Sequence, residues 1–177
     1  MFFNDENLIL VDISNFNTEN LNNLDYLFFG CTSLISIKLP KSNNPNLLTM
    51  NNMFSFCSEL ISIELSYFNI KNVEEMTSVF DNCYNLETII FSNLKNVNKM
   101  YKIFHNCISL KTKNFSKLKS KNVKSMANIF NGCLSLISID LSNFDSENLE
   151  KMDGMFQGCS SLNISIFQNL IQKMLKV

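Results

Sequence analysis

The feature that most constrains the fold is a cysteine that returns at a nearly fixed interval. Cysteines occur at Cys31, Cys57, Cys83, Cys107, Cys133 and Cys159, so the successive intervals are 26, 26, 24, 26 and 26 residues. Disulfide frameworks do not space their cysteines this regularly, whereas self-similarity at such a period is typical of a solenoid. The spacing therefore predicts one small buried residue per repeat, and neither disulfides nor a metal site.

Each repeat changes its apolar period from helical to extended. A phenylalanine lies three residues before each cysteine and a leucine three residues after it, as in Phe80, Cys83 and Leu86. Before the cysteine the apolar positions are three and four residues apart, which predicts one face of a short helix. After it they alternate, which predicts a strand. We therefore expect each repeat to contain a strand, a loop, a helix and a turn.

An asparagine column precedes each expected helix. Its members are Asn20, Asn46, Asn72, Asn96, Asn122 and Asn148. Asparagine is a preferred helix N-cap, so this column predicts helices of about ten residues that end just before the cysteines. With only 4 Gly and 2 Pro, the chain does not indicate a fold based on tight glycine turns.

A unit of this size cannot bury its own apolar stripe, but stacked units can. The sequence predicts an α/β leucine-rich-repeat solenoid of about six and a half repeats, with a parallel β-sheet on one face and short helices on the other. We expect one domain over residues 1–177: a partial first repeat over 1–23, six repeats over 24–165 and a capping helix over 166–177. No comparable cap precedes the first repeat, so self-association at that end and a longer array are both open.

The repeat motif resembles a known family. It has the form Met-x-x-Met-Phe-x-x-Cys-x-x-Leu-x-x-Ile-x-Leu-Ser-x-Phe, and residues 126–152 (MANIFNGCLSLISIDLSNFDSENLEKM) match it well. This resembles the BspA-like leucine-rich repeats of bacterial, mycoplasma and protist surface proteins. The resemblance implies a non-catalytic adhesion module at the cell surface that binds a host or matrix protein. An intracellular scaffold that uses the same fold is the alternative.

Two columns of the expected strands point away from the core. The residue five after each of the first five cysteines bears a hydroxyl, and the residue seven after it varies. We predict that these columns form a partner-binding sheet face, although hydroxyls also suit a solvated strand. The predicted contact residues are Ser36, Lys38, Ser62, Glu64, Thr88, Ile90, Thr112, Asn114, Ser138 and Asp140.

Other function classes find no support in the sequence. The single histidine, His105, has no nucleophile and orienting acid arranged around it, so we expect no catalysis, no cofactor and no metal site. A net charge of −1, with all 15 basic residues being lysine, argues against nucleic acid. No apolar run approaches the ~20 residues of a membrane span. No signal peptide is visible, so a cytoplasmic location remains the alternative to the cell surface.

Overall fold

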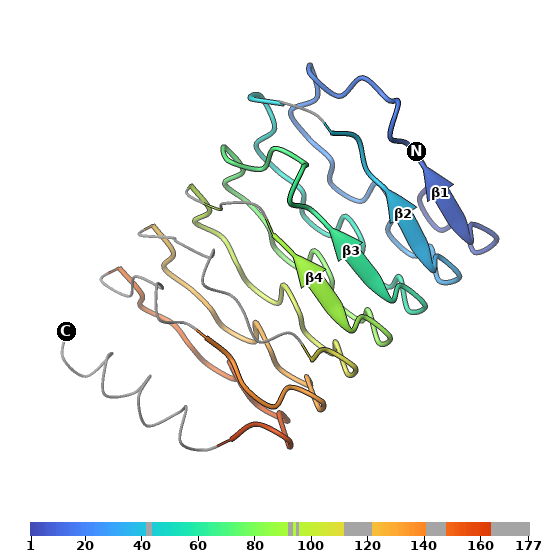
Figure 1. Cartoon of the computed structure of the whole chain (residues 1–177). Coiled ribbons are helices and arrows are strands. Elements are labelled where there is room, and N and C mark those ends of the chain that lie inside the picture. Colours follow the sequence, from blue (N-terminus) through green and yellow to red (C-terminus); the bar gives the residue numbers. More distant parts are fainter. Residues whose placement is uncertain (42–43, 92–93, 95, 112–121, 141–147, 164–177) are drawn as a thin grey trace.

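The fold is a stack of similar coils that follow one another from the N-terminus (Figure 1). The computed structural model describes residues 1–41, 44–91, 94, 96–111, 122–140 and 148–163, and every structural statement below concerns these residues. The capping helix expected over 166–177 lies outside them, as do Thr112 and Asn114. The predicted solenoid of leucine-rich repeats is confirmed.

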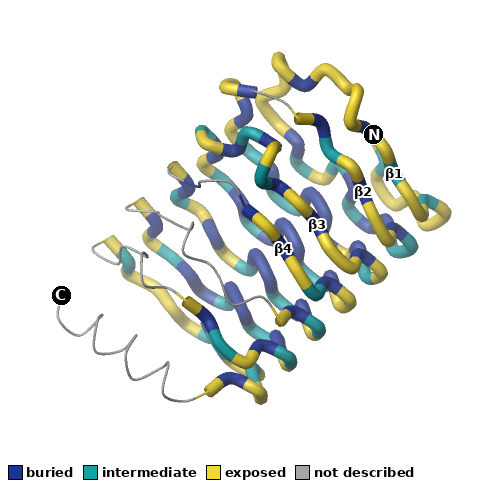
Figure 2. The backbone as a smooth tube through the Cα atoms, in the orientation of Figure 1, coloured by how far each residue is buried: buried dark blue, intermediate teal, exposed yellow. Residues whose placement is uncertain are grey.

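One face of the stack is formed by short parallel strands. They are β1 (Leu10–Asp12), β2 (Ser36–Lys38), β3 (Ser62–Glu64) and β4 (Thr88–Ile90). β1 pairs with β2 and β3 pairs with β4, each in a register of one repeat. The middle residue of β2, β3 and β4 is buried and its two neighbours are exposed (Figure 2). The alternation read from the sequence therefore places a strand in each of the first four coils.

The opposite side of each coil consists of turns, where helices were expected. We call these nine-residue stretches the turn segments; they cover 23–31, 49–57, 75–83, 99–107, 125–133 and 151–159, and residues 1–5 form the end of another. Within them, Phe29 N donates to Tyr26 O at 3.2 Å, but Phe28 N donates to Met53 O of the next coil at 2.9 Å. Alternate backbone amides therefore donate to the next coil, so they are not available for the hydrogen bonds that a helix would need. No described segment is helical.

A left-handed backbone at two positions per turn segment explains this difference. Thirteen described residues have positive φ, and they fall five residues and one residue before the cysteine position of the repeats. Nine of them are asparagine (five) or glycine (four), the residues that tolerate this conformation best. A right-handed helix cannot continue through such positions. Asparagine takes the place of glycine here, which is why the low glycine count was misleading.

The asparagine column joins coils and caps no helix. Asn72 Nδ2 donates to Pro45 O at 2.8 Å, and Asn46 Nδ2 donates to Glu19 O at 3.1 Å. Each side chain thus satisfies a backbone carbonyl of the preceding coil, where no strand hydrogen bond is available. The predicted capping role is therefore wrong. The even spacing of the column follows from the repeat of the coils.

Phenylalanine and cysteine form two stacked columns within the core between the two faces, beside buried leucine, methionine and isoleucine. The phenylalanine rings lie nearly parallel at centroid distances of 5.0–5.7 Å, from Phe2 through Phe28 to Phe156. Phe2 continues the column into the first, partial repeat. Beside the rings, five of the six cysteines are buried, and Cys159 is partly buried. The column spacing sets the distance between coils and so holds the surface side chains in straight rows.

Candidate functional site

The predicted sheet face exists as an exposed surface. Ser36, Lys38, Ser62 and Glu64 are exposed on β2 and β3, and Thr88 and Ile90 are exposed on β4. Asp140 is also exposed, whereas Ser138 is half-buried. On β2, β3 and β4 the exposed members therefore occupy the first and the last residue of each strand, and these strands lie one after another along the stack (Figure 1).

The charged row of this face is held by short polar contacts. Lys38 Nζ lies 3.3 Å from Asp12 Oδ2 of β1. Ser14 Oγ donates to Asp12 Oδ1 at 2.6 Å, and Ser66 Oγ donates to Glu64 Oε1 at 2.6 Å. The hydrogen bonds from Ser14, followed by the Lys38 ammonium, lower the pKa of Asp12. The face consequently presents fixed, oriented charges of both signs at neutral pH.

A hollow opens at the ends of β2 and β3. Its volume is about 550 Å³, and Lys38 and Glu64 belong to its lining. Lys41 lies over the ring of Tyr67, with Nζ 5.0 Å from the ring centroid, at the same hollow. The hollow lies next to the predicted contact rows.

An apolar row beside the sheet was missed in the sequence. Ile9, Ile35 and Ile61 immediately precede the exposed strand row, and all three are exposed. We call them the isoleucine stripe. In the next coils the equivalent positions are Glu87 and Lys111, whose charged groups lie 3.1 Å apart. The sequence does contain a signal for this exposed row. Isoleucine recurs four residues after the cysteine position, directly before the hydroxyl column that is expected to face solvent.

The cysteines form a buried row of thiols. Each Sγ donates to the carbonyl of the phenylalanine in the preceding coil at 2.9–3.1 Å, as Cys83 does to Phe54. All six are free, as predicted. Burial raises the pKa of Cys83 and Cys107 well above the ordinary thiol value, and it raises that of Cys159 to about 11. The thiols are therefore packing groups and poor nucleophiles.

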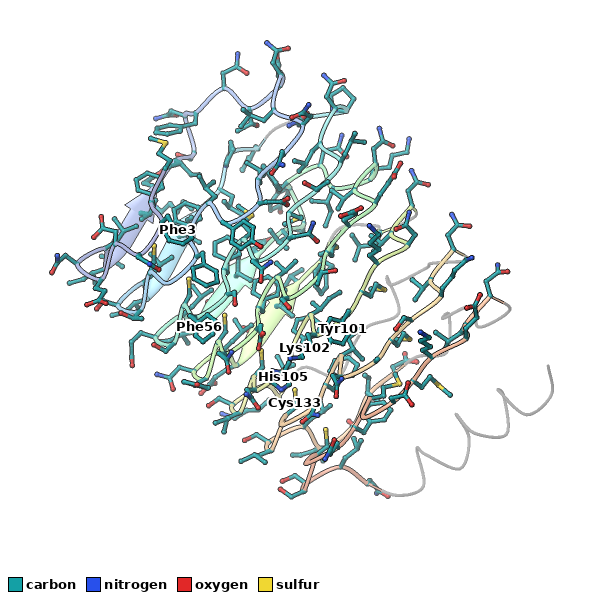
Figure 3. The ribbon with its side chains drawn as sticks, turned by 180° about the vertical axis from the view of Figure 1, so that it is seen from behind. Phe3, Phe56, Tyr101, Lys102, His105 and Cys133 are labelled. Carbon is teal, nitrogen blue, oxygen red and sulfur yellow. The ribbon has the colours of Figure 1, made fainter. Side chains whose placement is uncertain are left out.

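His105 pairs with an acid in the neighbouring coil. Its Nδ1 lies 2.7 Å from Asp81 Oδ1, and both side chains are mostly buried. The thiol of Cys107 donates a hydrogen bond to Phe80 O, so it does not form a nucleophile–base pair with His105. The pair links two coils on the turn side, which Figure 3 shows from behind.

Neither a metal-ligand cluster nor a membrane-spanning helix is found among the described residues. In the described ranges, histidine, cysteine, aspartate and glutamate do not gather in threes at any place that could hold a metal ion. Nor does this part of the chain contain a helix with the length and apolarity of a bilayer span.

Comparison with protein families identifies the chain. Residues 1–92 and 84–176 each match the model of a family described as "Mycoplasma protein of unknown function, DUF285". The chain belongs to this family. Because the two matches together span nearly all residues, the DUF285 unit corresponds to a group of coils and not to the whole solenoid. No curated protein matches the chain.

Solved structures share the fold of this DUF285 protein. A leucine-rich-repeat protein of T. pallidum matches with a TM-score of 0.65 and 22% identity, over 98% of this chain and 73% of that one. A leucine-rich-repeat protein of Eubacterium ventriosum matches at 0.48 and 15%, over 85% and 43%. A leucine-rich cell surface protein of Faecalibacterium prausnitzii matches at 0.38 and 18%, over 92% and 60%. The T. pallidum structure shows that the chain shares the leucine-rich-repeat fold.

Proposed function

We propose that this chain is a non-catalytic protein-binding module that docks a partner on its sheet face. The observation that carries the proposal is the isoleucine stripe, which exposes a row of aliphatic side chains along β1, β2 and β3. Protein interfaces combine an apolar centre with a polar rim. Here the hydroxyl and charged rows supply that rim, and the hollow beside Lys38 and Glu64 supplies a recess.

The repeat geometry supports an extended partner surface. Parallel strands in one register place equivalent side chains of successive coils next to each other, so single substitutions in one column change the face locally. The stripe is interrupted where Glu87 and Lys111 pair, and an exposed isoleucine returns to the column at Ile137, so the continuous apolar row covers the first three coils.

A binding measurement with matched variants tests the sheet face. We expect Ile61→Lys to weaken adhesion of the purified chain to an immobilised basement-membrane extract by about tenfold or more, as loss of an interface anchor does. Leu134→Lys is the control, because Leu134 is also exposed but lies outside the stripe. Equal binding by wild type and both variants would show that the partner does not use this face.

We further propose, on the resemblance to leucine-rich-repeat surface proteins, that the chain acts at the cell surface as an adhesin. The six free thiols favour the alternative, a scaffold in a reducing compartment, because disulfides persist mainly in oxidising ones. Labelling intact cells with a membrane-impermeant amine reagent separates the two. The surface proposal fails if the chain is labelled only after lysis.

A further inference from the structure

The turn side of the first coils exposes a cluster of four aromatic rings. Phe3 and Phe29 stack at 5.1 Å between centroids, Tyr26 lies 5.6 Å from Phe29, and Phe56 meets Phe29 edge-on at 5.4 Å. Phe3, Tyr26 and Phe56 are 55%, 46% and 43% exposed. We call these four rings the aromatic patch; Figure 3 shows Phe3 and Phe56 on this side.

Two rings of the aromatic patch occupy backbone positions that disfavour them. Tyr26 has φ 58° and Phe56 has φ 63°, both left-handed. The equivalent residues in other coils include Asn52 and Asn82, which suit this conformation. Residues in disfavoured backbone positions cluster at functional sites, although Ser78 and Lys102 also occupy the left-handed column of Tyr26. The fold itself does not require a ring at either position, because asparagine meets the same backbone demand.

The sequence that carries the aromatic patch is acidic. Residues 1–37 and 42–70 contain no lysine, arginine or histidine side chain. Four acidic residues lie within the turn segments that carry the rings or within two residues after them: Asp5, Glu6, Asp25 and Glu59. A positively charged group approaching the rings would therefore meet attraction from the carboxylates as well as from the ring faces.

Two other exposed rings, Tyr67 and Tyr101, are covered by lysines of the chain itself, whereas Phe16 and Tyr84 are exposed singly, outside any ring cluster. Lys102 Nζ lies 5.5 Å from the centroid of Tyr101, and Lys41 covers Tyr67 in the same way. Lys102 occupies the column of Tyr26, five residues before the cysteine. In the described part of the chain, the aromatic patch has no such cover from a lysine.

We propose that the aromatic patch binds an arginine- or lysine-bearing segment of a partner protein through cation–π contacts. The guanidinium or ammonium group takes the place over the rings that Lys102 takes over Tyr101. The carboxylates around the patch orient the approaching segment and add salt-dependent attraction. This site lies on the turn side, so it is independent of partner binding on the sheet face.

Calorimetric titration of the whole chain with a synthetic Gly-Ser-Arg repeat peptide tests the proposal. We expect the arginine peptide to bind, a lysine version to bind more weakly, and a version with glutamine in place of arginine not to bind. Phe56→Asn and Tyr26→Asn should each weaken binding about tenfold, because each removes a ring. Both variants should stay folded, since asparagine already fills these columns.

Lys102→Asn is the matched control, because it changes the same column in a coil outside the aromatic patch, and it should leave binding unchanged. Several results would overturn the proposal: no binding of the arginine peptide, equal binding of the glutamine peptide, or binding that survives both ring substitutions. Concentration-dependent dimerisation in sedimentation, abolished by Phe56→Asn while the arginine peptide fails to bind, would instead assign the patch to a second copy of the chain.

Discussion

The turn segments of the first coils and those of the later coils share one backbone but differ in chemistry. The column two residues before the cysteine position holds Phe3 and Phe29 in the first coils and Asp81 and His105 in later ones. Left-handed residues recur at the same two places throughout. The fold therefore fixes the backbone of the turn side and leaves its outward columns free to vary.

The largest expected effect tests whether both regions depend on the same core. Phe54→Ala and Phe104→Ala each remove a fully buried ring stacked on both sides, so we expect each to lower the free energy of unfolding by about 3–5 kcal/mol. Urea unfolding followed by circular dichroism measures this. Phe3→Ala, in an exposed ring, is the control. A Phe104 variant as stable as the Phe3 variant would show that the stack does not extend into the later coils.

An intermediate effect comes from exchanging the side chains of the two regions. Asn106→Phe places a ring at a left-handed position and removes the hydrogen bond from Asn106 Nδ2 to Asn82 Oδ1, so it should destabilise the chain by about 1–2 kcal/mol. Phe56→Asn should stabilise it by up to about 1 kcal/mol. Thermal unfolding of both variants checks the opposite signs. Equal stability of Asn106→Phe and wild type would mean that this backbone does not select asparagine.

The smallest effect lies at the boundary between the regions. Lys99, followed by Asn51, forms hydrogen bonds that lower the pKa of Glu75 from 4.5. A lowered carboxyl pKa stabilises the fold above pH 4.5, and this contribution disappears as the pH falls through the lower folded value. The pair is partly exposed, so Glu75→Gln should cost only a few tenths of a kcal/mol, and only near neutral pH. A cost that persists at about pH 3 would point to packing rather than charge.

The sequence predicted the repeat, the strands and the buried cysteines, because each depends on side-chain burial that recurs with the period. It did not predict the turns. Apolar residues at Met76, Val79 and Phe80 have helical spacing, and consecutive turns produce the same spacing without helical hydrogen bonds. The recurrent glycine or asparagine before the cysteine, as at Asn82, was the available signal.

The surfaces were predicted in part. Strand alternation was enough to place Ser62 and Glu64 outside, and whether a partner contacts them stays a prediction. Ile61 and Phe56 were missed because an isolated apolar residue beside a strand or a turn gives no sign of its exposure. The surface clusters that they form become visible only in the structure, where neighbouring coils align Ile61 with Ile35 and Phe56 with Phe29.

The row of thiols has a consequence for how such arrays change in length. Each thiol finds its acceptor in the backbone of the coil before it, so an added or deleted coil brings or removes a donor and an acceptor together. A disulfide framework would be left with an odd cysteine after the same event. Gene duplication can therefore lengthen this protein one coil at a time, with no need to re-pair its cysteines.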